Sequence, residues 1–142
     1  MMNNAMNDKK IKHLEMIENV IERMAGNCFQ LKGWTIALIG LVTVFFSSAN
    51  VQSFLGIIVF LVLAFWYMDS YYLQLEKKYR ILYRNVCEKS EDQIDFNMDL
   101  QNIEINESDK KKTSKRKCLF SDSELGFYGP VVLAVLVLRY LL

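Results

Sequence analysis

The sequence has few of the residues on which most catalytic and metal sites depend. Its 142 residues include one histidine, one proline and three cysteines. The cysteines, Cys28, Cys87 and Cys118, are far apart, so no Cys-x-x-Cys pair or zinc-type spacing occurs. No nucleophile motif or glycine-rich phosphate loop is present. These absences argue against an enzyme and against a metal or cofactor site, and we expect His13 to lie on the polar side of a helix without a catalytic role.

Charge is missing altogether from one long stretch of the chain. The 17 Lys and Arg residues nearly balance the 16 Asp and Glu residues, but the 36 residues from Gly33 to Met68 hold no charged residue and no histidine. A membrane span needs about 20 apolar residues, with about 17 as the lower limit. The sequence therefore predicts two short spans, at about 33–48 and 53–71, joined by a polar turn at 47–53. A buried helical hairpin of a soluble protein is the alternative, although little of the chain is left to cover it.

A third apolar stretch runs from Leu125 to Leu142. The part after Pro130 is too short to cross a hydrocarbon core of about 30 Å. Ser121 and Glu124 have the spacing of a capping box, which predicts that the helix begins there and contains Pro130. We therefore expect a third span at 121–142, and an interfacial helix is the alternative.

Apolar residues recur every three or four positions on both sides of the charge-free run. The two series are Leu14, Ile17, Ile21, Met24, Cys28 and Leu31, and then Tyr72, Leu75, Tyr79, Leu82 and Val86. This spacing places each series on one stripe of a helix. We expect the two stripes to pack against each other in antiparallel helices that extend the hairpin into the cytosol.

Lys and Arg residues flank the expected hairpin on one side. Residues 1–32 hold five of them and residues 73–120 hold eleven, whereas the expected turn holds none. Because positive residues concentrate in cytoplasmic segments, we expect the N-terminus and residues 73–120 in the cytosol and the turn outside.

An acidic segment occupies residues 90–109, with seven acidic residues and no basic one. Polar and apolar residues alternate from Ile94 to Gln101, a period of two that is typical of a strand. The sequence therefore predicts a short cytosolic β segment, which needs a second strand for pairing. An acidic disordered linker is the alternative.

A basic tract follows at once, with six positive charges in the eight residues from Lys110 to Lys117. Such a tract attracts phosphate-rich ligands, including cyclic nucleotides and single-stranded oligonucleotides. Three further basic residues share one face of the preceding helix. The candidate ligand-binding residues are Lys77, Arg80, Arg84, Lys110, Lys111, Lys112, Lys115, Arg116 and Lys117. Contact with anionic lipids and pairing with the acidic segment are the alternatives.

Small and hydroxyl residues indicate where helices could approach one another or line a path. Gly26, Gly33 and Gly40 recur every seven residues, and small residues let helix backbones pack closely in lipid. Three spans alone enclose no aqueous path, so a homo-oligomer is the simplest way to form one. The candidate pore or vestibule residues are Thr43, Ser47 and Asp69. Packing within one subunit is the alternative for the small residues, and a plain helix-end acid is the alternative for Asp69.

Four short sequence segments resemble segments of known proteins. They are His-Leu-Glu at 13–15, Phe-Gln-Leu-Lys-Gly-Trp-Thr at 29–35, Phe-Trp-Tyr-Met-Asp-Ser-Tyr-Tyr-Leu at 65–73 and Phe-Tyr-Gly-Pro at 127–130. Together with the order of the spans, they resemble small bacterial membrane proteins of anti-phage loci. The layout is similar to that of the SLATT membrane effectors, which have two spans, and to the membrane partner of nucleotidyltransferases in Hailong-type defence.

The resemblance implies an ion channel or pore effector of antiviral defence in the bacterial inner membrane. It would be a homo-oligomer, gated by a nucleotide or oligonucleotide that a companion nucleotidyltransferase makes. A non-conducting membrane anchor that recruits a soluble partner protein is the alternative.

The expected fold class is an all-α membrane protein. A transmembrane hairpin at 33–72 extends into cytosolic helices within 1–32 and 73–120. A short β segment and a third transmembrane helix at 121–142 complete it.

Overall fold

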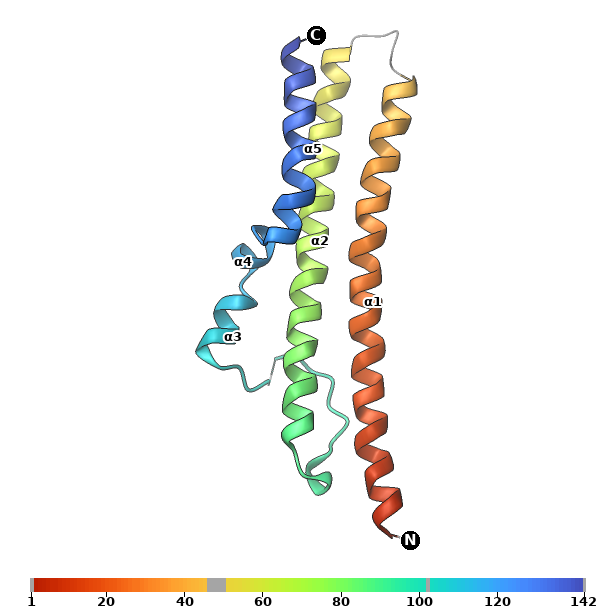
Figure 1. The fold of residues 1–142 in the computed structure, drawn as a ribbon, viewed down its shortest axis with the longest axis vertical. Helices are drawn as coiled ribbons and strands as arrows, with labels where there is room; N and C mark the ends of the chain where they lie inside the picture. The colour runs from red at the N-terminus through yellow and green to blue at the C-terminus, as the bar shows by residue number, and fades with distance from the viewer. Residues whose placement is uncertain (1, 46–50, 102, 142) are drawn as a thin grey trace.

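Two long antiparallel helices form the framework of the molecule (Figure 1). In this computed structural model, which describes residues 2–45, 51–101 and 103–141, they are α1 (Met2–Phe45) and α2 (Val51–Glu88). The elements that follow are η1 (Glu91–Gln93, a 3-10 helix), α3 (Glu107–Lys112), α4 (Lys115–Leu119) and α5 (Asp122–Leu141). Helices are the only regular secondary structure among the described residues, and the prediction of an all-α fold is confirmed at this level.

Both framework helices run without a break through the expected boundaries. α1 has 44 residues and α2 has 38, which correspond to about 66 Å and about 57 Å at 1.5 Å per residue. Neither Gly26 nor the expected boundary after Lys32 interrupts α1. The expected turn at 47–53 falls partly outside the described residues, and α2 begins within it. Each helix therefore joins an apolar half to an amphipathic half in one rigid rod.

The predicted apolar stripes pack against each other and form the interface between α1 and α2, which we call the α1–α2 seam. Ile17 of α1 is fully buried, and it belongs to one cluster with Leu82 and Val86 of α2. Other stripe residues pack around this cluster, namely Leu14, Ile21 and Tyr79. The antiparallel pairing of the two stripes is thus confirmed.

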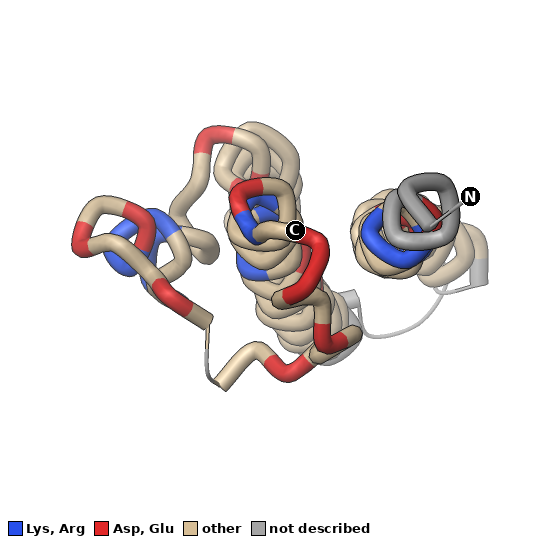
Figure 2. Tube along the Cα trace, turned by 90° about the horizontal axis from the view of Figure 1, so that it is seen from below, with Lys and Arg blue, Asp and Glu red and all other residues tan. Residues whose placement is uncertain are grey.

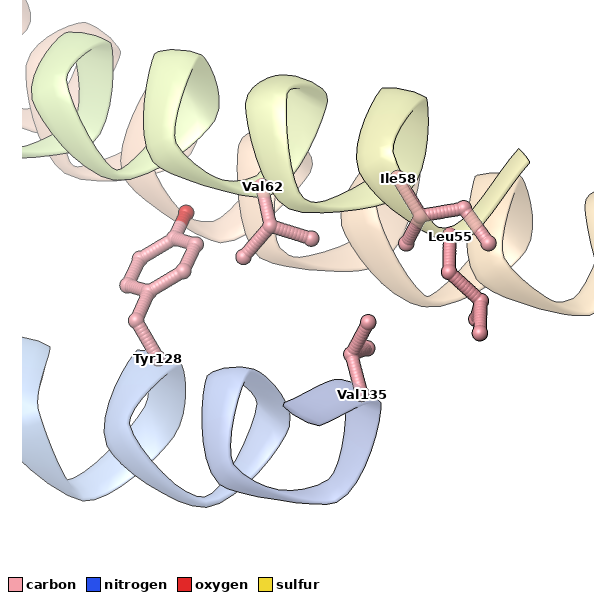
Figure 3. Close-up of a cluster of buried hydrophobic side chains, with 5 residues drawn as sticks. All are labelled: Leu55, Ile58, Val62, Tyr128 and Val135. Carbon is pink, nitrogen blue, oxygen red and sulfur yellow. The ribbon is translucent and has the colours of Figure 1, made fainter. Parts of the chain in front are cut away.

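The third long helix, α5, packs against the apolar half of α2 (Figure 3). The buried side chains that join the two helices are Leu55, Ile58, Val62, Tyr128 and Val135. The start of α5 agrees with the prediction, because the backbone N–H of Glu124 donates to Ser121 Oγ at 3.4 Å. Pro130 lies inside the helix.

The connection between α2 and α5 runs back along α2 and is tied to it by α2 side chains. The bonds are Trp66 Nε1 to Leu119 O at 3.0 Å, Gln74 Nε2 to Thr113 O at 2.7 Å, Arg84 to Asp109 Oδ2 at 2.8 Å and Asn85 Nδ2 to Glu104 O at 2.9 Å. Donors later in α2 reach acceptors earlier in the connection, so α3 and α4 run antiparallel to α2. Figure 2 shows acidic positions along this connection and basic positions in its α3–α4 part.

The β segment predicted at 94–101 is wrong, because these residues follow η1 as an irregular segment. Asp95, Asn97 and Asp99 each accept a hydrogen bond from the backbone N–H two residues later, at 3.2, 2.8 and 2.9 Å. These bonds use amides that a strand would offer to a neighbour. The alternating apolar side chains still have a role, because Ile94 and Met98 pack on the α1–α2 seam. The alternation therefore reflects a half-buried segment without a partner strand.

His13 is fully buried, contrary to the expectation that it lies on a polar surface. The irregular segment covers this face of α1, and the Phe96 ring centroid lies 5.3 Å from that of His13. Phe96 has a φ of 52°, a left-handed conformation that is uncommon for a residue with a side chain. The residue whose ring covers His13 therefore has a strained backbone conformation.

Large apolar side chains face outward along the hairpin and α5. Phe29 is 80% exposed, Phe60 71% and Leu133 63%. Among the described residues, one helix, Leu55–Glu88, is long and apolar enough to cross a membrane by length and composition, and 28% of its apolar window is buried inside the molecule. A buried helix of a soluble protein can meet the same criteria, but exposed apolar area on this scale is typical of a surface that contacts lipid or another protein.

We expect Ile17→Ala to destabilise the amphipathic half of the hairpin by about 2–5 kcal/mol, because it leaves a cavity between α1 and α2. Ile11→Ala, the same change at a position that is 45% exposed on the same helix, is the matched control. Denaturant unfolding of the purified protein in detergent, followed by circular dichroism, measures both. Equal losses in the two variants would contradict the seam.

Candidate functional site

Four polar side chains from three helices meet beside the apolar core. Lys32 of α1, Asp69 of α2, and Glu124 and Tyr128 of α5 form what we call the buried charged cluster. Asp69 and Tyr128 are completely buried and Glu124 is 1% exposed, whereas the Lys32 side chain is 21% exposed. Charged residues are seldom buried without a strong reason. The cluster is therefore the candidate functional site.

Lys32 occupies the centre of the cluster. Its Nζ lies 2.5 Å from Asp69 Oδ2 and 3.0 Å from Glu124 Oε1. The same ammonium lies 5.9 Å and 5.8 Å from the ring centroids of Phe127 and Tyr128, within the range of cation–π attraction. One side chain of α1 thus bonds to both α2 and α5.

Asp69 receives further donors from its neighbours. The Tyr128 hydroxyl donates to Asp69 Oδ2 at 3.0 Å, and Figure 3 shows this ring pointing from α5 toward α2. The Tyr128 ring stacks on Trp66, with centroids 5.9 Å apart and an angle of 9° between the planes. The Cys28 thiol donates to the backbone carbonyl of Asp69 at 3.7 Å. These contacts fix the position of the carboxylate.

The surroundings of Lys32 favour its charged form. Burial by itself lowers the pKa of the ammonium, but the hydrogen bonds with Asp69 and Glu124 outweigh burial and raise the pKa above its usual value. For Cys28, burial and the neighbouring Asp69 carboxylate both raise the pKa of the thiol. Lys32 therefore acts as a fixed positive charge, and Cys28 as a neutral thiol.

The basic tract lies on the outside of α3 and α4. Lys110, Lys111, Lys112, Lys115, Arg116 and Lys117 are all exposed. Arg84 joins them, because its ion pair with Asp109, at 2.8 Å, lies directly before the tract. Lys77 lies beside Cys118, where it opposes the rise that burial causes in the pKa of that thiol. The structure thus brings two of the three predicted α2 residues to the tract.

Arg80 is placed differently. It pairs with Glu76 of its own helix at 2.8 Å. It also lines a groove of about 390 Å³ between α1 and α2, with Glu18, Glu22 and Tyr83. Arg80 therefore faces acidic residues of α1 and is not gathered with the tract.

The three predicted pore residues have different outcomes. Asp69 faces Lys32 inside the subunit. Thr43 lies in α1, but its side chain is outside the described residues, as is the whole of Ser47. Whether these residues line a path stays a prediction.

Sequence reasoning gave no site role to Lys32, Glu124 or Tyr128. Lys32 entered only as a topology signal, and Glu124 only as a capping residue. A signal was nonetheless present, because Lys32 and Asp69 directly flank the charge-free run. A hairpin with its turn midway places the two flanking residues at the same depth, and opposite charges at one depth predict a pair. The sequence held no comparable signal for the position of α5.

No protein-family model, curated protein sequence or solved structure matches the chain.

We expect Lys32→Met to destabilise the protein by about 3–5 kcal/mol, because it leaves two buried carboxylates without their cation. Lys12→Met, the same change at an exposed position of α1, is the control. Unfolding in detergent measures both variants, and a loss in Lys32→Met no larger than in the control would contradict the cluster. If Lys32→Met does not fold, Lys32→Arg keeps the charge and should retain most of the stability.

The thiols should differ in reactivity toward N-ethylmaleimide, which attacks the thiolate. Cys87 is exposed, whereas Cys28 is partly buried and its pKa is raised. We expect Cys87 to be modified at least about tenfold faster than Cys28 near pH 8, as followed by mass spectrometry of peptides. In Asp69→Asn the difference between the two modification rates should become smaller, because the variant lacks the carboxylate that disfavours the Cys28 thiolate. Similar rates in the wild-type chain would contradict this placement.

Proposed function

We propose that the chain is a three-span membrane protein whose subunits assemble into an ion channel, gated from the cytosol by an anionic ligand. The outward apolar side chains of α2 and α5 support contact with lipid or neighbouring subunits. The beginning of α1 and the end of α5 lie at opposite ends of the molecule (Figure 1). That arrangement is what three crossings with a cytosolic N-terminus require.

A conducting path in this proposal lies between subunits. A cavity between the apolar halves of α1 and α2 measures only about 10 Å³, and residues such as Leu38, Val42 and Val62 line it. A cavity of that size holds at most about one water molecule. Ions therefore need a path that several copies of the chain form together.

The basic tract carries the ligand-binding part of the proposal. Its six side chains are exposed, and no ion pair of theirs is present among the described residues. Arg84 already shows how an anionic group is held here, through its pair with Asp109. A nucleotide or oligonucleotide phosphate would add to the same surface.

The connection from the tract to the buried charged cluster supplies a route for gating. The tract ends at Lys117, Leu119 accepts the bond from Trp66, and α5 begins three residues later with Glu124 in its first turn. A ligand that shifts α4 therefore pulls on Glu124. Since Glu124 is bonded to Lys32, this movement changes how α5 is held against α1 and α2.

The biological role rests on the sequence resemblance. We propose an effector of bacterial antiviral defence whose ligand is made by a companion nucleotidyltransferase, and whose opening depolarises the inner membrane. The channel activity, the ligand class and the setting are what the resemblance implies, and the residues themselves support an oligomeric helical membrane protein with an exposed basic tract. The gating proposal rests on one observation, namely that a short connection joins the exposed basic tract to the buried charged cluster.

The test is ion flux from liposomes that contain the purified protein, with and without cyclic nucleotides and short oligonucleotides. One of these ligands should change the flux, with an affinity that falls steeply as salt rises. Lys110→Glu with Lys111→Glu should abolish the response. Lys9→Glu with Lys12→Glu, which changes the charge equally at exposed α1 positions, should leave it intact.

The mass of the detergent-solubilised particle completes the experiment. A particle of several subunits is expected. A monomer or dimer without flux under any condition would contradict the channel and favour the non-conducting anchor.

A further inference from the structure

The buried charged cluster has one donor too few. Among the described residues, two of its buried oxygen atoms, Asp69 Oδ1 and Glu124 Oε2, have no hydrogen-bond partner. Their carboxyl groups bond to the same Lys32 ammonium, at 2.5 Å and 3.0 Å, which places the two groups side by side. The two unsatisfied acceptors therefore belong to neighbouring groups.

The charges of the cluster are equally unbalanced. If both carboxyl groups are ionised, two negative charges face one ammonium in a site that is closed on the carboxylate side. Two carboxylates so close together do not both ionise readily, because each raises the cost of charging the other. A single additional positive charge removes both deficits.

We propose that the buried charged cluster is a proton-binding site, in which one proton is shared between Glu124 Oε2 and Asp69 Oδ1. One hydrogen on Glu124 Oε2, pointing to Asp69 Oδ1, satisfies both unpartnered oxygens and leaves one carboxylate for one ammonium. We place the proton on Glu124 because Asp69 already accepts hydrogen bonds from both Lys32 and Tyr128, whereas Glu124 accepts one from Lys32 alone.

Every element packed on the site contributes groups that fit this assignment. α1 supplies the Lys32 ammonium and the neutral Cys28 thiol, α2 supplies Asp69, and α5 supplies Glu124 and the Tyr128 hydroxyl. A metal ion would have to sit beside the ammonium, which disfavours it. The Lys32 side chain is 21% exposed, so the cluster adjoins solvent on its ammonium side.

The site binds the proton more tightly than the unfolded chain does, so the sign of its pH dependence is fixed. The bound proton stabilises the folded protein at low pH, and this stabilisation is lost as the pH rises through the range in which the site releases the proton. The second negative charge then stays in the closed site. If the proposed gating is correct, release of the proton loosens the hold of α5 on α1 and α2, and this extension alone rests on the proposed function.

The experiment compares the wild-type chain with Glu124→Gln in detergent, from about pH 6 to about pH 9. A Gln amide donates to Asp69 Oδ1 at any pH, as the protonated acid would. The wild-type Tm should fall by about 5 °C or more as the pH rises, and that of Glu124→Gln by less than about 2 °C. Glu88→Gln, at an exposed position, should keep the wild-type slope, and Asp69→Asn should lower Tm at every pH.

Infrared difference spectra observe the proton directly. The band of a protonated carboxylic acid should be present in the wild-type protein at neutral pH and absent in Glu124→Gln. Equal pH slopes in these two proteins, a low Tm of Glu124→Gln at every pH, or no such band would overturn the proposal. So would a rise in Tm at high pH caused by Na⁺ but not by choline at equal ionic strength. None of these measurements needs ion flux, so a failed channel proposal does not affect their meaning.

Discussion

A single ammonium group shared by two buried carboxylates holds the three long helices together. Lys32 bonds to Asp69 and Glu124 at 2.5 and 3.0 Å, and each partner comes from a different helix. Apolar contacts between helices are tolerant of small shifts, whereas buried charges are costly when separated. The ion pairs therefore fix the position of α5 along α2, in addition to the apolar packing of Leu55, Ile58 and Val62.

The molecule has two halves with different chemistry. In the apolar half, α1, α2 and α5 present large apolar side chains outward, and in the amphipathic half the α1–α2 seam is covered by an irregular acidic segment. The buried charged cluster lies where the halves meet. The connection from the amphipathic half enters α5 at the turn that holds Glu124, and we therefore place gating and proton binding in the same group of residues.

This arrangement also links the two proposed ligands, the anion on the basic tract and the proton in the buried charged cluster. An anion on the basic tract and a proton on Glu124 act on the same helix, from its preceding connection and from its first turn. Thermodynamic linkage then requires that each changes the binding of the other if both depend on the position of α5. The two proposals nevertheless rest on separate observations, exposed cations in one case and unsatisfied buried oxygens in the other.

Several parts of the sequence pattern predicted structure correctly, because they are local. The 3-and-4 spacing of apolar residues specified the α1 and α2 stripes, and Ser121 specified the start of α5, since helix periodicity and capping depend on neighbours in the chain. The alternation at 94–101 predicted a strand, and that prediction is wrong. A strand needs a partner, whereas here the Asp95 and Asn97 side chains accept hydrogen bonds from the backbone amides of the segment itself.

By itself, the sequence determined the helical segments, the charge-free run and the positions of the opposing charges at its two ends. Only the tertiary structure decided that Glu124 and Tyr128 join Lys32 and Asp69, that Arg80 turns away from the basic tract, and that His13 is covered. The physical reason is that periodicity fixes which face of a helix is apolar, whereas partners across helices depend on how distant segments dock. Two unsatisfied oxygens become visible only after that docking has taken place.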